Sequence, residues 1–207
     1  MARSEQRVIL ASASPRRREL LERFGLPFEV IPARGEERAP EGLTPAELVE
    51  RLSRAKAGEV AAAAEDREAV IIAADTVVEL EGEILGKPRD EAEARAMLRR
   101  LSGRTHRVWT GVTVRRGDEH RTESVCTAVE FRPLSEEEIR AYVSTGEPLD
   151  KAGAYGYQGL ACLFVEEIRG DYFNVVGLPL CRLGRMLRAF DLDLLPPASG
   201  RESEDRL

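Results

Sequence analysis

The segment AVIIAADTVVEL, residues 69–80, decides the fold. It is almost continuously apolar and rich in β-branched residues, a pattern typical of a strand covered on both faces. We therefore expect it to form the centre of a sheet. Asp75 breaks the pattern, because a charged, unpaired carboxylate buried there would cost several kcal/mol. A cation must compensate it, whether a metal ion, a lysine or both, unless Asp75 lies at the strand's end and bonds a nearby turn.

Helical and strand-like segments alternate on both sides of residues 69–80. Helix starts are marked by Ser14 before Pro15, by Asp90, and by capping-box spacing at Thr44 and at Ser135. We expect helices over residues 15–25, 45–65, 91–101, 136–146 and 179–190, strands over 7–11, 27–33, 69–80 and 160–168, and a hairpin over 106–133 that turns at 116–118. Residues 170–174 are expected to form a polar turn. The order predicts an α/β protein with a mixed sheet flanked by helices.

The size and composition of the chain limit its organisation and class. With 207 residues, of which 43% are hydrophobic, it can bury a real core, and we expect one domain over residues 1–195 with a disordered tail at 196–207. No apolar run of about 18 residues could span a bilayer, and the first residues lack the apolar stretch of a signal peptide. We therefore expect a cytoplasmic protein with no membrane partner.

Charge and cysteine content narrow the class further. A net charge of −6 argues against a protein that coats nucleic acid, although a local basic patch can still bind a phosphate group. Cys126, Cys162 and Cys181 are well separated and odd in number, so a disulfide framework or a structural zinc site is not expected. We expect the three cysteines to be small buried hydrophobic side chains.

Lysine is rare in this chain. Of 31 lysines and arginines, only Lys56, Lys87 and Lys151 are lysines, which indicates that lysine persists where a compact, flexible ammonium is needed. Lys87 lies on a predicted turn about twelve residues after Asp75, where it could act as a mobile charge on a phosphate. Lys56 lies on the flank of the second helix. The alternatives are an exposed turn lysine and a surface lysine whose stem covers apolar residues.

The segment SASPRRRE, residues 12–19, predicts an anion site. The start of a helix presents unpaired backbone N–H groups and the positive end of the helix dipole, and Ser12, Ser14, Arg16 and Arg17 add to them. The alternative is that Ser14 and Pro15 only begin the helix while the arginines lie in water.

The segment PLDKAGAYGYQG, residues 148–159, is too rich in glycine for a helix and too broken for a strand. Its glycines would let the backbone approach a ligand closely, and Gln158 could recognise a planar ring through one donated and one accepted hydrogen bond. The alternative is a long, mobile connection. Glu36 and Glu37 form an acidic pair on a loop, which is usually only solvated. Taken together, these features predict a site for a phosphorylated planar ligand with a divalent metal ion.

Several linked motifs resemble the Maf family of nucleoside triphosphate pyrophosphatases. The matching segments are SASPRRRELL, AADTVV, GEILGKPRDEAEARAMLRRLSGRTHRVWTGV, DKAGAYGYQG and NVVGLPL, in that order, and they extend from about residue 8 to residue 190. The SPRR, ADT and glycine-loop motifs resemble the branch that hydrolyses dTTP and UTP rather than the branch that acts on 7-methyl-GTP. Tyr157 departs from the isoleucine common before the glutamine, which leaves Gln158 in place.

The resemblance implies an elongated α/β fold like that of ITPase-type pyrophosphatases, with two lobes and a central cleft. It implies that Asp75 is the general base and that Arg16, Thr76 and Gln158 select the substrate. It also implies phosphate binding by Ser12, Arg17, Lys56 and Lys87, and a Mg²⁺ or Mn²⁺ ion held by Glu37 and Asp75. A homodimer is expected by the same resemblance, and the role of Lys151 is left open.

Three functions follow from these residues. The first is hydrolysis of dTTP or UTP to the monophosphate and pyrophosphate. The second is the same chemistry on modified nucleotides, including 7-methyl-GTP. The third is a regulatory nucleotide-binding protein that inhibits septum formation, which would need the charged cleft but no general base at Asp75.

Overall fold

The predicted central strand is confirmed. In the computed structural model, which describes residues 6–35 and 42–195, β3 (Val70–Leu80) lies inside a seven-stranded sheet of order β2-β1-β3-β5-β6-β7, with β4 paired to β3. The other strands are β1 (Val8–Leu10), β2 (Glu29–Val30), β4 (Glu83–Leu85), β5 (Thr105–Arg116), β6 (Glu119–Phe131) and β7 (Val165–Arg169). β1 is parallel to β2 and β3, and the other pairs are antiparallel, so the sheet is mixed as predicted.

The helices other than the short one at residues 172–176 begin within one residue of the predicted starts. They are α1 (Pro15–Glu22), α2 (Pro45–Ala63), α3 (Glu91–Leu101), α4 (Glu136–Val143), α5 (Tyr172–Val176) and α6 (Leu180–Arg188). Reciprocal capping boxes start α2 and α4, and the Asp90 side chain caps α3. Ser14 occupies the N-cap position of α1, but its side chain makes no cap bond. Among the described helices, none is both long and apolar enough to cross a membrane.

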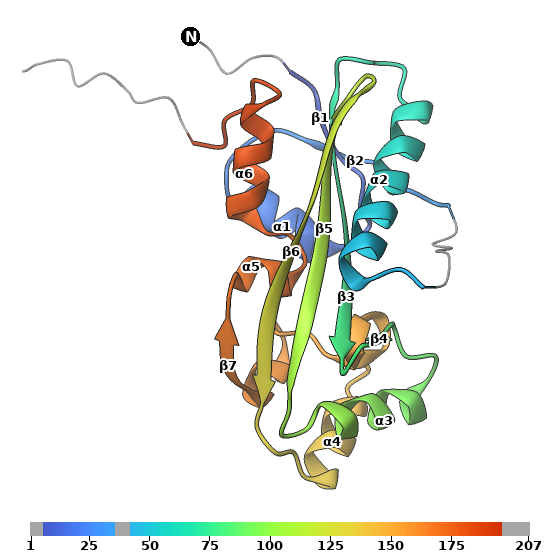
Figure 1. Ribbon diagram of the computed structural model, residues 1–207, viewed down its shortest axis with the longest axis vertical. Coiled ribbons are helices and arrows are strands. Elements are labelled where there is room, and N and C mark those ends of the chain that lie inside the picture. Colours follow the sequence, from blue (N-terminus) through green and yellow to red (C-terminus); the bar gives the residue numbers. More distant parts are fainter. Residues whose placement is uncertain (1–5, 36–41, 196–207) are drawn as a thin grey trace, which may run out of the picture.

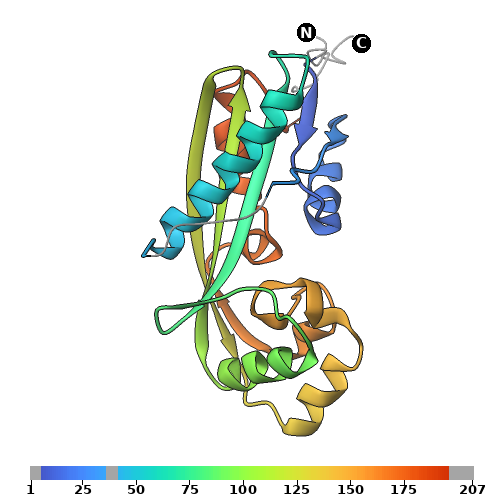
Figure 2. The same ribbon diagram turned by 90° about the vertical axis from the view of Figure 1, so that its right-hand side faces the viewer.

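The helices gather at two ends of the long sheet (Figures 1 and 2). At one end, α2 lies across one face of the sheet while α1 and α6 pack on the other, and their apolar side chains form two separate core clusters with β1 and the first half of β3. At the other end, α3 and α4 pack against the second half of β3 in a third cluster. The two ends correspond to the two lobes expected from the sequence.

One edge of β3 is open at its middle. β5 pairs with β3 along one edge, from Ile71 to Glu79. On the other edge, β1 pairs with residues 70–72 and β4 with residues 78–80. Within the described part of the chain, residues 73–77 therefore have no strand partner on that edge. Asp75 and Thr76 lie in this gap, where the two lobes meet.

The backbone of α2 rests directly on the sheet at Gly111. This residue is the β5 partner of Asp75, and a Cβ atom at Gly111 would lie 2.3 Å from the carbonyl carbon and oxygen of Val49 in α2. Ser53 on the same helix shares a 3.0 Å hydrogen bond with Thr113 of β5. Glycine is therefore needed at position 111 for close approach rather than for a turn.

Three segments differ from the predictions. The glycine-rich segment was predicted to hold no helix, but it begins with two short 3₁₀ helices, Glu147–Asp150 and Ala152–Ala154, which need only three or four residues each. Residues 160–168 were predicted to be one strand, but a 3₁₀ helix (Leu160–Phe164) precedes β7. It buries Ala161 and Phe164, three residues apart, as 3₁₀ geometry allows, whereas a strand would alternate. The predicted polar turn at 170–174 is instead the start of α5, because the Asp171 side chain accepts hydrogen bonds from the backbone N–H groups of Phe173 and Asn174.

The prediction of buried cysteines is also wrong. Cys162 and Cys181 are exposed and Cys126 is only partly buried. Cys162 follows the buried Ala161 on a helix whose next residue, Leu163, is 67% exposed. Residues 36–41 and the predicted tail at 196–207 lie outside the described residues.

Replacing Gly111 tests the close contact between α2 and the sheet. We expect Gly111→Ala to lower the free energy of unfolding by about 1–3 kcal/mol, because the methyl group overlaps backbone atoms that can move only with the helix. Urea unfolding measures the change. Gly58→Ala, inside α2, is the matched control, since the new Cβ meets only one arginine atom at 3.8 Å. It should stabilise the protein by up to about 1 kcal/mol, and equal effects at the two sites would contradict the argument.

A buried histidine makes the α3–α4 lobe sensitive to acid. His106 is 1% exposed, its Nε2 lies 2.8 Å from the Tyr155 hydroxyl, and burial lowers its pKa to about 4. Between pH 6.5 and 4 the unfolded chain therefore binds a proton that the folded chain does not. Stability contributed by neutral His106 is fully present above pH 6.5 and falls by about 3 kcal/mol as the pH drops to 4.

Urea unfolding at pH 7 and pH 4.5 checks this prediction. A His106→Gln variant keeps a hydrogen-bonding partner for Tyr155 but does not titrate, so its stability should fall less than that of the unmodified protein over the same pH interval. Parallel pH profiles for the two proteins would show that His106 is not responsible.

Candidate active site

A cleft of about 820 Å³ opens at the gap in the edge of β3. Its walls come from the β1–α1 connection, α2, the middle of β3, the β4–α3 connection, the glycine-rich segment 148–159 and the end of α5. Every predicted site residue that the structure describes lines it: Ser12, Arg16, Arg17, Lys56, Asp75, Thr76, Lys87 and Gln158. Lys151 lines it as well. Glu37, the other predicted metal ligand, lies outside the described residues.

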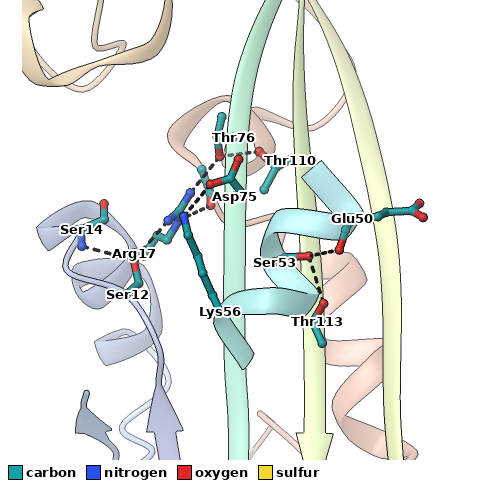
Figure 3. Close-up of polar contacts among 11 residues, drawn as sticks. Ser12, Ser14, Arg17, Glu50, Ser53, Lys56, Asp75, Thr76, Thr110 and Thr113 are labelled. Carbon is teal, nitrogen blue, oxygen red and sulfur yellow. Dashed lines mark hydrogen bonds and ion pairs between the residues drawn. The ribbon is translucent and has the colours of Figure 1, made fainter. Parts of the chain in front are cut away.

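Asp75 is compensated by a lysine. The residue is 6% exposed, and Lys56 Nζ donates to its Oδ1 at 2.6 Å (Figure 3). The Lys56 side chain is only 18% exposed, so the alternative of a surface lysine is wrong. Lys56 reaches the carboxylate because α2 lies so close to the sheet at Gly111. The Lys56 ammonium supplies the opposite charge that a buried carboxylate needs.

Arg17 connects three elements at the floor of the cleft. Its Nε donates to the carbonyl oxygen of Gly177 at 2.8 Å, its Nη1 to Ser12 Oγ at 3.1 Å, and its Nη2 to Thr76 Oγ1 at 3.0 Å. Figure 3 shows the guanidinium between the β1–α1 connection and β3. The geometry therefore rules out the alternative that Arg17 simply lies in water.

A row of polar side chains continues from Thr76 across the buried face of the sheet. Thr76 and Thr110 share a hydrogen bond of 2.9 Å, and Thr110 donates to the Asn174 carbonyl oxygen at 3.0 Å. Asn174 Nδ2 donates to the Val108 carbonyl oxygen and to Thr127 Oγ1, at 2.9 and 3.0 Å. Asn174 is fully buried, and its side chain fastens α5 to β5 and β6. Sequence reasoning missed it, although a lone polar residue before the apolar VVGLPL is a usable signal.

The remaining cations come from the rim of the cleft. Arg16 Nη1 lies 3.9 Å from Asp150 Oδ2, so α1 and the segment 147–150 meet at one side. Lys87 lines the cleft from the β4–α3 connection, and Gly86 in that connection accepts a backbone hydrogen bond from Gly153 at 3.0 Å. The β4–α3 connection and the glycine-rich segment are therefore held side by side.

The donor set suits a polyanion. Arg16, Arg17, Lys56, Lys87 and Lys151 line the cleft together with only two carboxylates among the described residues, Asp75 and Asp150. No group of three or more histidine, cysteine or acidic side chains suited to a metal occurs in the described part of the chain. A single buried carboxylate still fits Mg²⁺, which commonly takes one or two carboxylates and completes its shell with phosphate oxygens and water.

Comparison with known proteins agrees with this geometry. A family model described as a Maf-like protein matches residues 7–190. The chain belongs to this family. It is 51% identical over 195 residues to a dTTP/UTP pyrophosphatase of Symbiobacterium thermophilum, covering 94% of this chain and 100% of that protein. It is 54% identical over 191 residues to a dTTP/UTP pyrophosphatase of Moorella thermoacetica, covering 91% and 97% of the two chains.

Among solved structures, the Ham1 protein of Staphylococcus aureus overlaps part of this Maf-family chain. The match has a TM-score of 0.45 and 18% identity, and it covers 61% of this chain and 72% of that one. No conclusion about the fold is drawn from this partial match. The order and direction of the strands show the mixed sheet directly.

The pairing of Lys56 with Asp75 can be tested by a double-mutant cycle. Lys56→Met leaves a buried carboxylate without its ammonium and should lower the free energy of unfolding by about 3 kcal/mol at pH 7. Adding Asp75→Asn should cost less than the sum of the two single changes, because the second substitution removes the charge left behind. Urea unfolding of the four proteins gives the coupling, and strictly additive losses would exclude it.

Proposed function

We propose that the protein is a nucleoside triphosphate pyrophosphatase that hydrolyses dTTP and UTP to the monophosphate and pyrophosphate. The observation that carries the proposal is the Asp75–Lys56 pair at the floor of a cleft lined by cations. Relatives named dTTP/UTP pyrophosphatase, about half identical over more than nine tenths of the chain, support it.

Asp75 is proposed as the general base. A water molecule attacks the α-phosphorus, the bond from that phosphorus to the bridging oxygen breaks, and pyrophosphate leaves with the electron pair. Asp75 accepts the proton of the attacking water. Lys56 fixes the orientation of the carboxylate through the 2.6 Å hydrogen bond to Oδ1.

The cations are proposed to hold the triphosphate, since phosphoryl transfer depends mainly on positioning and on stabilising developing charge. Arg16, Lys87 and the N-terminal end of α1 border the cleft, and Arg17 is held rigid by Ser12 and Gly177. An arginine fixed in this way needs no further ordering when the substrate binds.

Base selection is assigned chiefly to Gln158. It lines the cleft from the glycine-rich segment, and its side-chain amide can pair with the adjacent donor and acceptor of a uracil or thymine ring. Arg16 and Thr76 are proposed to contribute to substrate selection as well. The Thr76 hydroxyl accepts a hydrogen bond from Arg17 and shares one with Thr110.

Asp75 and Glu37 would hold a Mg²⁺ or Mn²⁺ ion together with the substrate's phosphate oxygens. When bound, the ion would neutralise part of the triphosphate charge. We also predict that the protein forms a homodimer and that it is located in the cytoplasm.

An endpoint assay of the purified protein tests the proposal. With Mg²⁺ or Mn²⁺ we expect monophosphate and pyrophosphate from dTTP and UTP, and little product from CTP, ATP, GTP or 7-methyl-GTP. Faster turnover of 7-methyl-GTP or another modified nucleotide would favour the second function. Binding without turnover of any nucleotide would favour the regulatory one.

Asp75→Asn tests the general base. We expect turnover of dTTP to fall by at least about 10²-fold, because the amide cannot accept the proton, while dTTP binding measured by calorimetry persists. Lys87→Met is the matched control and should weaken binding, since Lys87 is assigned to the phosphates. Turnover retained by the Asp75→Asn variant would exclude Asp75 as the base.

A further inference from the structure

The glycine-rich segment 148–159 is anchored from behind by Glu147. The carboxylate of Glu147 accepts a hydrogen bond from the Tyr142 hydroxyl at 2.9 Å and from the backbone N–H of Leu160 at 3.1 Å. The Tyr142 hydroxyl in turn accepts from the backbone N–H of Gly156 at 3.2 Å. Gln158 lies between these two anchored backbone positions. The segment is therefore tied to α4 and to Glu147 by hydrogen bonds, which argues against the alternative of a mobile connection.

Lys151 turns back onto its own segment. Its Nζ donates to the Glu147 carbonyl oxygen at 2.6 Å and to Asp150 Oδ1 at 2.5 Å, and its side chain is only 14% exposed. Two of the three ammonium donors are thus used within residues 147–151. This geometry distinguishes Lys151 from Lys87, whose ammonium makes no such hydrogen bond to the described residues.

Gly156 and Gly159 leave room for the side chains of Lys151 and Glu147. A Cβ at Gly159 would lie 2.2 Å from Oε1 of Glu147, and a Cβ at Gly156 would lie 2.5 Å from Cε of Lys151. The close backbone approach that the sequence predicted toward a ligand is here made toward Glu147 and Lys151. A larger residue at either position would have to displace the end of the Lys151 or Glu147 side chain, and with it the contacts that this side chain makes to the segment.

The segment is also held on its outer side. Tyr157, the residue that departs from the usual isoleucine, makes an edge contact with Tyr172 of α5, with ring centroids 5.3 Å apart. The same short helix ends at Gly177, which accepts the hydrogen bond of Arg17. The positions of Gln158 and Arg17 are therefore linked through α5.

We infer that Glu147 and Lys151 are positioning residues for base selection: they fix the segment 148–159 so that Gln158 meets the base, and neither binds the phosphates. The inference rests on the proposed function and deepens it. Tyr142 belongs to the same anchor, and its burial together with its bond to Glu147 raises its pKa, which keeps the hydroxyl protonated as a donor.

Comparing two lysine variants separates positioning from phosphate binding. In an Asp75→Asn background, in which we expect little turnover, calorimetry measures the Kd of dTTP and of inorganic tripolyphosphate, which has no base. We expect Lys151→Met to raise the Kd of dTTP about tenfold, the factor equivalent to about 1.4 kcal/mol, and to leave that of tripolyphosphate unchanged. Lys87→Met should raise both. Equal losses for both ligands in Lys151→Met would assign Lys151 to the phosphates and overturn the inference.

Hydrogen exchange provides a readout that does not depend on any ligand. We expect Tyr142→Phe and Glu147→Gln to speed exchange of the amides of Gly156 and Leu160, while amides in β3 keep their protection. Unchanged exchange of the Gly156 and Leu160 amides would show that the anchor does not hold the segment.

The two proposals can fail separately. Turnover of dTTP by the unmodified protein decides the proposed function. If that turnover is found but the Lys151→Met variant weakens dTTP and tripolyphosphate equally, only the positioning role is lost. The other case is that no turnover is found, but the anchor variants loosen the segment and weaken the binding of dTTP and not of tripolyphosphate. Glu147 and Lys151 would then position Gln158 in a nucleotide-binding site that is not catalytic.

Discussion

A buried carboxylate in the middle of the central strand is the constraint on which much of the structure depends. Asp75 needs a cation, and Lys56 supplies it from α2 at 2.6 Å. The lysine can reach only if α2 lies against the sheet, which the missing side chain of Gly111 permits. The same carboxylate lies where β3 has no neighbour on one edge, so one charge connects helix packing, sheet topology and the position of the cleft.

The parts of the fold with local signals could be predicted from the sequence. The apolar run at 69–80 predicted the central strand, and the capping residues predicted the starts of α2, α3 and α4, because a cap is decided within a few residues. The run at 160–168 was misjudged for the opposite reason. Short apolar runs fit a strand or a helix equally well. The packing of Ala161 and Phe164 in the core of the α3–α4 lobe, against residues distant in sequence, decided between them.

The site shows the same division. The position of Asp75 in an apolar strand predicted a compensating cation. No local pattern shows that Lys56, nineteen residues earlier, would provide it rather than another lysine. Gln158 and Arg17 stood out through their local sequence, a glycine-rich segment and the start of a helix, before any motif resemblance was considered. Asn174 did not, because its importance comes from Val108 and Thr127, which are 66 and 47 residues away in sequence. Long-range hydrogen bonds leave no periodic trace in a single sequence.

The polar row from Arg17 to Thr127 has a consequence for how the protein can change in evolution. Arg17, Thr76 and Thr110 are joined through their side chains, and Asn174 and Thr127 form a second side-chain pair, while Thr110 meets Asn174 only at its backbone carbonyl oxygen. Within either group a single apolar replacement leaves a buried partner without its hydrogen bond, whereas replacing both members of a pair can be nearly neutral. Thr127 and Asn174 should therefore covary among relatives. Sequence change on β6, which is remote from the cleft, is in this way constrained by α5, the helix that ends next to the Gly177 acceptor of Arg17.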